Sequence, residues 1–270
     1  RWCISDVRFK HKPPTERHTW IEAPFNDNRA VWQHLMGDDV WRIDYQMAPD
    51  ADPAYVSRED VVRERLAKQF GPDVECELVW VGPYAYKSQC LHSLRHGHVF
   101  FLGDTAKVVS PFGARGGNTG IADADNLAWK LAAVVDKKAP SVLLNSYNQE
   151  RLQAARRNVQ VANRTARYLR APEGIERLFR RATIGLAKRH GFARPLINTG
   201  RMAEANRYNA SSVCQAEGGF MVQNIGLQFT SQKTGCLGDL LLWADSHLLL
   251  LVFGQRTPQE LKQMRQLSQT

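Results

Sequence analysis

The chain has 270 residues, of which 43% are hydrophobic, and its formal net charge is +9 at pH 7. This length holds one large domain or two modest ones, with enough mass for a real hydrophobic core. The five cysteines are an odd and widely separated set without a CxxC pair, which argues against a disulfide framework and a metal site and fits a reducing cytoplasm.

The positive charge is concentrated between Arg151 and Arg194, where arginines recur along predicted helices. A basic chain is compatible with nucleic acid or an anionic membrane surface. No stacking aromatic residues are interleaved here, so we expect a solvated or partner-covered helix face and no nucleic-acid partner. The most apolar segment, 240–253, is cut by Asp245 and His247 and is too short to span a bilayer, so we expect no membrane partner.

Residues 1–98 are predicted to form an antiparallel sheet with one helix. From Val40 to Met47, apolar residues alternate with largely polar ones, which is typical of a strand with one buried face. A capping-box pattern at Ser57 and Asp60 predicts the start of the helix, and Gly71 its end. The predicted strands are 18–25, 30–36, 40–47, 74–81 and 84–91.

The stretch 99–135 carries the most specific pattern. Val99–Leu102 is a continuous apolar run, typical of a strand buried on both faces of a parallel sheet, and it ends at Gly103-Asp104. Ligands of such sheets bind beyond the carboxyl ends of the strands, so Asp104 is placed to accept hydrogen bonds from ligand hydroxyl groups. The loop that follows contains Pro111, Gly113, Gly116, Gly117 and Gly120, and glycine lets a backbone approach a flat ligand closely.

A helix is predicted after this loop, with Asn118 as its cap. The backbone N–H groups of Gly116, Gly117 and Asn118 would point out of the helix N-terminus, a position that favours anionic ligand atoms. Helical spacing predicts an inner face made of Ile121, Ala124, Ala128, Leu131, Ala132 and Val135.

Residues 103–131 resemble the second flavin-binding motif of the FAD-dependent aromatic hydroxylases of the p-hydroxybenzoate hydroxylase and phenol hydroxylase type. In that family a GD pair is followed by a proline, a glycine-rich turn with an asparagine, and a helix beginning DAxNLAWKL. The corresponding residues here are Gly103-Asp104, Pro111, 113–118 and 123–131. Lys107 departs from the family, which usually has histidine after GDAA. The alternative is an ordinary strand, loop and helix without a ligand.

The resemblance implies a longer enzyme that reduces FAD with NAD(P)H and uses O2 to hydroxylate a phenol-like aromatic substrate. It implies that Gly103 and Asp104 belong to the FAD site, with Asp104 binding the ribityl chain. Gly116, Gly117 and Asn118 would present backbone groups to the pyrimidine edge of the flavin.

The resemblance also gives two candidate catalytic residues. Pro111 would line the flavin ring near its oxygen-reacting face, and Arg115 would add positive potential that stabilises the reduced flavin. The alternative for Arg115 is a solvent-facing loop arginine. Substrate contacts are expected from sheet aromatics, for which a core position is the alternative: Trp41, Tyr45, Tyr84 and Tyr86.

Beyond residue 135, Ser141 is expected to cap a long helix that ends near Leu169. A second helix would run to Gly191, with an apolar face of Ile175, Leu178, Phe179, Ala182 and Leu186. Strand material is predicted within 240–253, and Thr257 and Glu260 give a capping box for a last helix.

The predicted fold class is α+β, with four parts. Residues 1–98 would be a substrate-covering antiparallel-sheet domain, and 99–190 the second half of an α/β FAD-binding domain with a helical extension. Residues 191–238 would be a linker. Residues 239–270 would be the truncated start of a thioredoxin-like C-terminal domain, as in the phenol hydroxylase branch.

No GxGxxG motif follows a strand in the 270 residues. In the family this motif holds the ADP half of FAD, so we expect the chain to be an internal portion of the enzyme. The alternative is a non-catalytic fragment or degenerate homologue that does not bind FAD alone. Two other functions stay open: a flavin halogenase or oxidase, and a module that binds anionic surfaces. The sequence also leaves open the substrate, the choice between NADH and NADPH, and the oligomeric state, for which a homodimer is possible.

Overall fold

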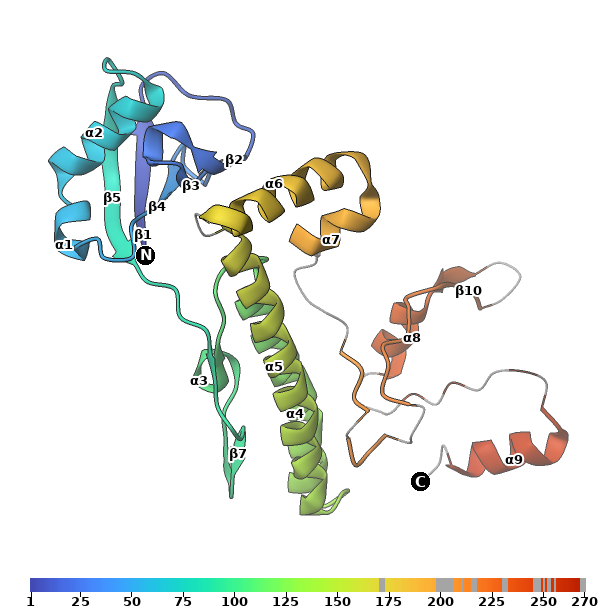
Figure 1. Ribbon diagram of the computed structural model, residues 1–270. Coiled ribbons are helices and arrows are strands. Elements are labelled where there is room, and N and C mark those ends of the chain that lie inside the picture. The colour runs from blue at the N-terminus through green and yellow to red at the C-terminus, as the bar shows by residue number, and fades with distance from the viewer. Residues whose placement is uncertain are drawn as a thin grey trace. The chain divides into compact units, whose positions relative to one another are not determined.

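The computed structural model describes residues 1–169, 173–197, 206–209, 211–214, 218–229, 233–244, 249, 251, 254 and 256–267. The chain divides into two compact units, residues 1–220 and residues 221–270. The first unit combines a five-stranded sheet with long helices (Figure 1). The predicted fold class, α+β with an antiparallel sheet, is confirmed.

The sheet has the strand order β2-β3-β4-β1-β5, and every neighbouring pair is antiparallel. Its strands are β1 (Trp2–Phe9), β2 (His18–Ala23), β3 (Arg29–Leu35), β4 (Trp41–Gln46) and β5 (Cys76–Tyr84). The predicted hairpin joins β3 to β4 through a turn in which Asp38 and Asp39 have φ of 58° and 56°. Two consecutive positive φ values match the right-handed twist of the flanking strands.

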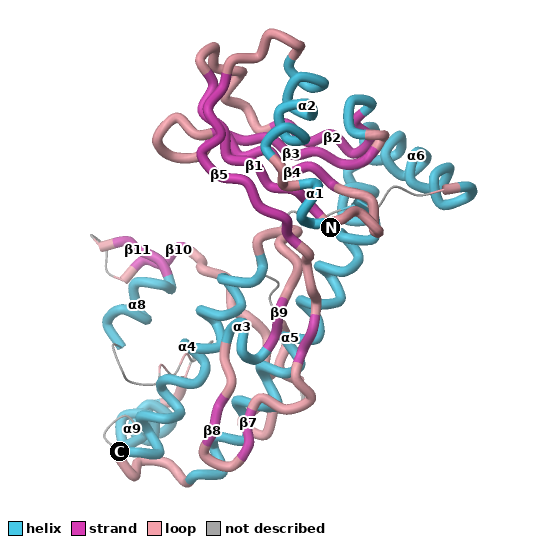
Figure 2. The backbone as a smooth tube through the Cα atoms, turned by 90° about the vertical axis from the view of Figure 1, so that its left-hand side faces the viewer, coloured by secondary structure: helices cyan, strands magenta, loops and turns pink. Residues whose placement is uncertain are grey.

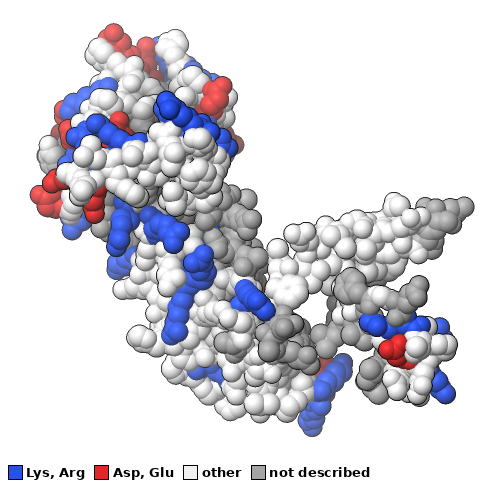
Figure 3. All heavy atoms as spheres, turned by 45° about the vertical axis from the view of Figure 1, so that its right-hand side comes forward, with Lys and Arg blue, Asp and Glu red and all other residues white. Residues whose placement is uncertain are grey.

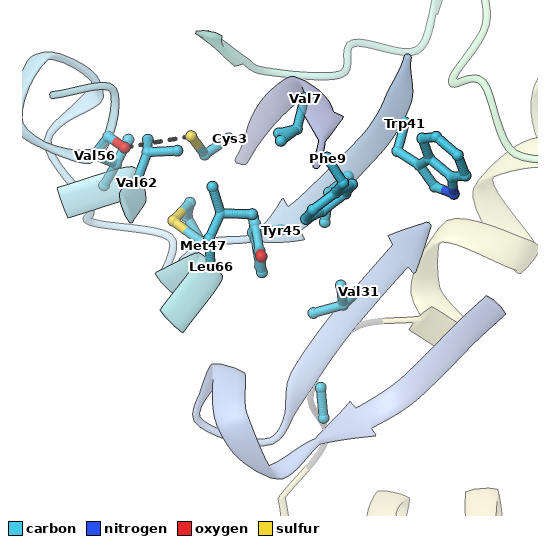
Figure 4. Close-up of a cluster of buried hydrophobic side chains, with 12 residues drawn as sticks. Cys3, Val7, Phe9, Val31, Trp41, Tyr45, Met47, Val56, Val62 and Leu66 are labelled. Carbon is cyan, nitrogen blue, oxygen red and sulfur yellow. Dashed lines mark hydrogen bonds between the residues drawn. The ribbon is translucent and has the colours of Figure 1, made fainter. Parts of the chain in front are cut away.

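One face of the sheet packs against α1 (Pro53–Val56) and α2 (Glu59–Phe70). Figure 4 shows this core, in which Trp41 and Tyr45 of β4 lie in one cluster with Leu66 of α2. The predicted capping role of Ser57 is wrong, because its hydroxyl donates to the Pro53 carbonyl and α2 begins after Arg58. Gly71, with φ of 106°, ends the helix as predicted.

The opposite face of the sheet carries a second buried cluster, which contains Trp2 of β1, Trp32 of β3 and Phe112 of the glycine-rich loop, with Tyr86 packed against it. Leu169, at the end of a long helix, completes this cluster. This face of the sheet therefore lies against the glycine-rich loop, which belongs to the segment that resembles a flavin-binding motif.

Several short elements follow: β6 (Gln89–Cys90), β7 (Arg95–His96), β8 (Val99–Phe100), α3 (Gly103–Ala106) and β9 (Lys107–Val108). The prediction that Val99–Leu102 is a strand buried in a parallel sheet is wrong for the residues that the structure describes. Only two residues are extended, β8 pairs antiparallel with β7, and Val99 is 57% exposed. The apolar side chains of 100–102 pack instead on a cluster with Leu127 and Tyr147 from two helices.

Those two helices are α4 (Arg115–Val135) and α5 (Leu144–Leu169), and a 3-10 turn at Ser141–Leu143 leads into α5 where the Ser141 cap was predicted. They lie side by side and antiparallel (Figures 1 and 2). They are followed by α6 (Gly174–Arg189), the 3-10 turn Gly191–Ala193 and α7 (Arg194–Ile197).

The predicted apolar face of α6 is not buried. Ile175, Leu178 and Phe179 are each at least 68% exposed, whereas Arg180 and Thr183 are buried. Arg180 reaches the sheet, where Nη2 donates to Glu22 Oε1 at 2.5 Å. This ion pair ties α6 to β2 by its polar side.

The second unit contains β10 (Gly226–Gln228), β11 (Thr234–Cys236), α8 (Leu237–Ala244) and α9 (Pro258–Leu267). The predicted strand material is wrong for Leu240–Ala244, which is helical, and most of the rest of 240–253 lies outside the described residues. The predicted capping box is present, because Thr257 N donates to Glu260 Oε2 and Glu260 N donates to Thr257 Oγ1. The thioredoxin-like assignment and the four domain boundaries stay predictions.

Charge is unevenly spread over the first unit. Figure 3 shows acidic and basic side chains mixed over the sheet, and mainly Lys and Arg on the visible face of the helical part. None of the described helices has the length and apolarity needed to cross a bilayer.

Candidate active site

The Gly103-Asp104 pair forms the start of α3, a single helical turn. Gly103 has φ of 54°, a conformation that favours glycine, and a Cβ added at Gly120 would lie 3.4 Å from the Gly103 Cα. The backbones of α3 and α4 therefore touch, and the exposed Asp104 is held beside the first turns of α4.

The N-terminus of α4 has an open, uncapped first turn. Its N-cap is Ala114, in the left-handed conformation with φ of 52°, and no side chain caps the helix. The prediction that Asn118 is the cap is wrong: the helix begins at Arg115, and Asn118 Nδ2 donates to the Ala114 carbonyl at 2.7 Å. A Cβ at Gly116 or Gly117 would meet nothing within 4 Å. Free backbone donors and open space together suit an anionic, flat ligand.

The glycine-rich loop is anchored to the sheet by Phe112. Its ring centroid lies 5.0 Å from that of Trp32 and 5.4 Å from that of Tyr86. The neighbouring Pro111 is exposed, and its carbonyl accepts the Ala114 N–H at 2.9 Å. Phe112 thus fixes the loop on the sheet while Pro111 stays accessible to a ligand.

Arg115 does not face solvent. It is 1% exposed, and its Nη1 donates to Asn158 Oδ1 of α5 at 3.2 Å. The solvent-facing alternative is therefore wrong. A charge in this position acts on the loop from behind, where burial strengthens its field.

Behind α3, Asp123 is the centre of a buried ionic network. Its Oδ2 accepts from the Gly103 backbone N–H at 3.0 Å and from Lys107 Nζ, and its Oδ1 accepts from Arg151 Nε at 2.8 Å. The side chains of Lys107, Asp123 and Arg151 are each at most 4% exposed. Burial opposes the charge of Arg151, but Tyr208 and Asp123 outweigh it and raise its pKa. Lys107 is the residue that departs from the family pattern. It forms an ion pair with Asp123, and Asp123 in turn accepts a hydrogen bond from the backbone of the GD turn.

A second buried ion pair lies about two turns further along α4. Lys130 Nζ donates to Glu150 Oε2 at 2.7 Å, and Asn126 donates to the same oxygen. Burial lowers the pKa of Lys130, and Glu150 acts against this shift. In the DAxNLAWKL segment, Asp123 and Lys130 are therefore buried and Asn126 is half-buried, and all three have partners on α5.

The predicted inner face of α4 is wrong except at Leu131, which packs against the cluster that contains Leu127 and Tyr147. Ile121 and Val135 are 72% and 75% exposed, whereas Arg115, Thr119, Asp123, Leu127 and Lys130 are buried. The polar side turns inward because α5 supplies charged and amide partners for it. Periodicity of α4 alone carries no information about those partners.

The structure separates the four predicted substrate aromatics. Trp41 and Tyr45 are 1% exposed in the core under α1 and α2, on the face of the sheet away from the glycine-rich loop. The prediction that they contact substrate is therefore wrong, because strand alternation places them on the other face. Tyr86 lies beside Phe112, and its ring centroid is 4.9 Å from that of the exposed Tyr84.

Two residues of the loop-facing side were missed from the sequence. Asp44 of β4 and Trp32 of β3 are directly paired in register. Both are buried, and neither Asp44 Oδ1 nor Trp32 Nε1 has a hydrogen-bond partner. Burial raises the pKa of Asp44 to about 6, with Arg42 opposing the shift and Asp6 adding to it. The sequence signal for Asp44 was its place among the polar residues that alternate with apolar ones in 40–47. These residues were interpreted only as the polar face of the strand.

The sequence matches one family over most of the first unit. Residues 2–162 match the FAD binding domain family, which covers the sheet, the GD turn, the glycine-rich loop and most of α5. The chain belongs to this family. The FAD binding domain therefore includes both faces of the candidate site.

Curated relatives and solved structures agree with this family. The chain is 35% identical over 157 residues to tetracenomycin B2 monooxygenase-dioxygenase of Streptomyces olivaceus, covering 58% of this chain and 26% of that protein. It is 40% identical over 107 residues to 4-methyl-5-nitrocatechol 5-monooxygenase of Burkholderia sp, covering 39% and 19%. The Diels-Alderase PyrE3 has the same fold, with a TM-score of 0.63 and 21% identity over 96% of this chain and 53% of that one. The chain thus spans about a quarter or less of the length of these two relatives.

Proposed function

We propose that this chain is part of an FAD-dependent monooxygenase that hydroxylates a phenol-like aromatic substrate with NAD(P)H and O2. The observation that carries the proposal is the contact of Phe112 with Trp32 and Tyr86, because it joins the glycine-rich loop to an aromatic sheet face. The names of two relatives, a monooxygenase-dioxygenase and a nitrocatechol monooxygenase, support this reaction class. The shared fold of PyrE3 does not carry it, because one fold hosts several reactions.

The residues around α4 fit one half of FAD. Asp104, exposed on the GD turn, would accept hydrogen bonds from ribityl hydroxyls. The uncapped N–H groups of Gly116 and Gly117, with the backbone of Asn118 beside them, would hold the pyrimidine edge of the flavin, where the helix N-terminus favours negative charge. FAD supplies the reduction and oxygen chemistry when it is bound.

The protein's own residues would orient the ring and the charge. Pro111 would lie against the ring, held by its turn to Ala114. Arg115 would act as a positioning residue through its buried charge rather than by contact. Tyr86, with Tyr84 beside it, would contribute an aromatic wall for the substrate.

The full-length protein that contains this chain provides the test. We expect it to bind FAD, to oxidise NAD(P)H faster when a phenol is present, and to release a product one oxygen heavier by mass spectrometry. Absence of flavin binding together with absence of phenol-dependent NAD(P)H oxidation would defeat the proposal.

Matched glycine variants locate the flavin. Gly117→Val puts a side chain into open space at the N-terminus of α4, and Gly185→Val does the same in α6. Because both glycines are helical and unobstructed, their folding costs should be similar. We expect only Gly117→Val to weaken FAD binding, by tenfold or more, and equal affinities would exclude this part of α4 from the flavin site.

The second candidate is a fragment of the same fold that does not bind FAD alone. Titrating the 270-residue chain with FAD and following flavin fluorescence distinguishes it, since tight binding with quenching would exclude it. For the cell, we propose a reducing cytoplasm, which is supported by the five free cysteines. The homodimer stays a prediction that sedimentation of the full-length protein can test.

A further inference from the structure

The sheet face beneath Phe112 carries a block of polar groups that the proposed flavin site does not use. In register, Trp32 pairs with Asp44 and His34 pairs with Arg42 across β3 and β4. On the other side of β4, Ile4 pairs with Asp44 and Asp6 with Arg42. Asp44 thus lies in a row between an indole and an aliphatic side chain, and beside a row of charged residues.

Arg42 and Asp6 of the charged row satisfy each other, whereas His34 Nδ1 of the same row is, like Asp44 Oδ1, buried without a hydrogen-bond partner. Arg42 Nε and Nη2 donate to the two carboxylate oxygens of Asp6 at 2.8 and 2.7 Å. Such a bidentate pair uses the fork of the guanidinium. Asp44 is 6% exposed, and its Oδ1 accepts no hydrogen bond.

A buried carboxylate oxygen without a donor is costly, since most buried polar atoms in proteins are paired. The neighbouring Trp32 Nε1 is a buried donor without an acceptor. One acceptor and one donor, on adjacent strands of the same face, are complementary to a hydroxyl group, which both donates and accepts. Facing side chains of such a pair are about 5 Å apart at Cβ, close enough for one oxygen to reach both.

We propose that Asp44 and Trp32 bind the phenolic hydroxyl of the substrate, with Asp44 as its proton acceptor. In the step, the phenol O–H bond breaks, the proton moves to Asp44 Oδ1, and the electron pair stays on the phenolate oxygen, where Trp32 Nε1 donates to it. The phenolate ring is richer in electrons and thus more reactive toward oxygen transfer. This assignment rests on the proposed function, and it specifies which residues bind the hydroxyl group of the substrate.

The electrostatic surroundings suit this exchange. Burial raises the pKa of Asp44 to about 6, Arg42 and Arg17 oppose the shift, and Asp6 adds to it. Burial, and then the charge of Asp44, raises the pKa of Tyr86, so Tyr86 remains a neutral neighbour. Burial and the charges of Arg17 and Arg42 lower the pKa of His34. A base with a pKa near the working pH is effective in proton transfer.

The same geometry predicts specificity. A substrate with a hydroxyl at this end satisfies both orphaned atoms, whereas its methyl ether leaves Asp44 without a donor. An aryl carboxylate would place a second negative charge beside Asp44. The subsite therefore selects phenols over ethers and over acids at the same ring position.

The test uses the full-length, FAD-loaded protein and three variants. Asp44→Asn removes the proton acceptor, and Trp32→Phe removes the indole donor but keeps an aromatic ring. Glu77→Gln, on the exposed part of β5 where Glu77 pairs with Arg8, is the matched control for loss of an acid from the sheet. Binding of a phenol and of its methyl ether is titrated by the change in flavin absorbance.

We expect the wild type and Glu77→Gln to prefer the phenol to the ether by about 10- to 100-fold, the range of one hydrogen bond to a charged group. Asp44→Asn should lose most of this preference, and Trp32→Phe part of it. The kcat/KM for the phenol should fall below pH about 6 in the wild type. This acid limb should vanish in Asp44→Asn.

An unchanged phenol preference and acid limb in Asp44→Asn would overturn the assignment while leaving hydroxylation in place. Failure of the wild type to bind any phenol would overturn it as well. A wild type that binds phenol in preference to ether but oxidises no NAD(P)H would instead defeat the proposed function and support the subsite. The two ideas therefore fail on different measurements.

Discussion

Replacing Asp44 by asparagine should change stability in a pH-dependent way. The carboxyl has a pKa of about 6 in the folded protein, against an ordinary value of 3.8 for aspartate. A raised pKa means that the ionised form is disfavoured by folding, so the penalty is full above pH 6 and vanishes below pH 3.8. At 1.36 kcal/mol per pH unit, the difference amounts to about 3 kcal/mol at pH 8. By linkage, about 1 kcal/mol of this penalty remains at pH 4.5.

Asparagine has nearly the same shape and no charge, so the variant escapes the penalty at every pH. Its buried amide has its own fixed cost, which leaves the pH dependence unaffected. We therefore expect the unfolding free energy of Asp44→Asn, relative to wild type, to be about 2 kcal/mol higher at pH 8 than at pH 4.5. Urea unfolding of the purified chain, followed by tryptophan fluorescence at both pH values, measures this difference.

Glu77→Gln serves as the control, because both partners of its ion pair are exposed and such pairs contribute little. Its relative stability should change by less than 0.5 kcal/mol over the same range. A pH-independent effect of Asp44→Asn would refute the reasoning, since it would mean that Asp44 ionises as easily in the folded chain as in the unfolded one.

Three further predictions concern the GD turn and its support. Asp123→Asn should lower the free energy of unfolding by about 3–5 kcal/mol, because it leaves two buried cations without a full charge partner. Asp125→Asn, at an exposed position of the same helix, should leave it unchanged. Equal urea midpoints for the two variants would contradict this. Gly103→Ala should cost about 1–2 kcal/mol because φ is 54°, while Gly37→Ala, in open space at an ordinary φ, should not, and thermal unfolding of both checks it. Lys107→His, which restores the usual family residue, should make stability fall as pH rises above about 7, since the imidazolium that pairs with Asp123 is then lost; a flat profile from pH 6 to 8 would speak against the pairing.

The part of the fold predicted from the sequence is the part governed by local signals. The turn at 37–39, the glycine stop at Gly71 and the capping box at Thr257 each act over a few residues, and the structure has all three. The alternation in β4 was also read correctly as two faces. Alternation cannot tell which face meets the glycine-rich loop, so Trp41 and Tyr45 were assigned to the wrong one.

The supporting side of the candidate site depends on contacts between distant residues. An apolar stripe on α4 favours burial only when an apolar partner exists, and the partner here offers Glu150, Arg151 and Asn158. These three lie within about two turns of α5, at one side of the helix. The sequence signal for the buried face of α4 was the pattern of complementary charges on α4 and α5. In deciding which face is buried, these charge pairs outweighed the hydrophobic periodicity of α4.

The two buried charge pairs also fix how far α4 can slide along α5. Apolar helix surfaces tolerate a shift by one turn, about 5.4 Å, because one aliphatic contact replaces another. Here such a shift would take Lys130 from Glu150 and Asp123 from Arg151, so that both buried ion pairs across the helix contact would be broken. The ion pairs therefore favour one alignment of the two helices, and the segment of the GD turn is held by both of them, by Asp123 of α4 at Gly103 N and by Tyr147 of α5 at the Phe101 carbonyl.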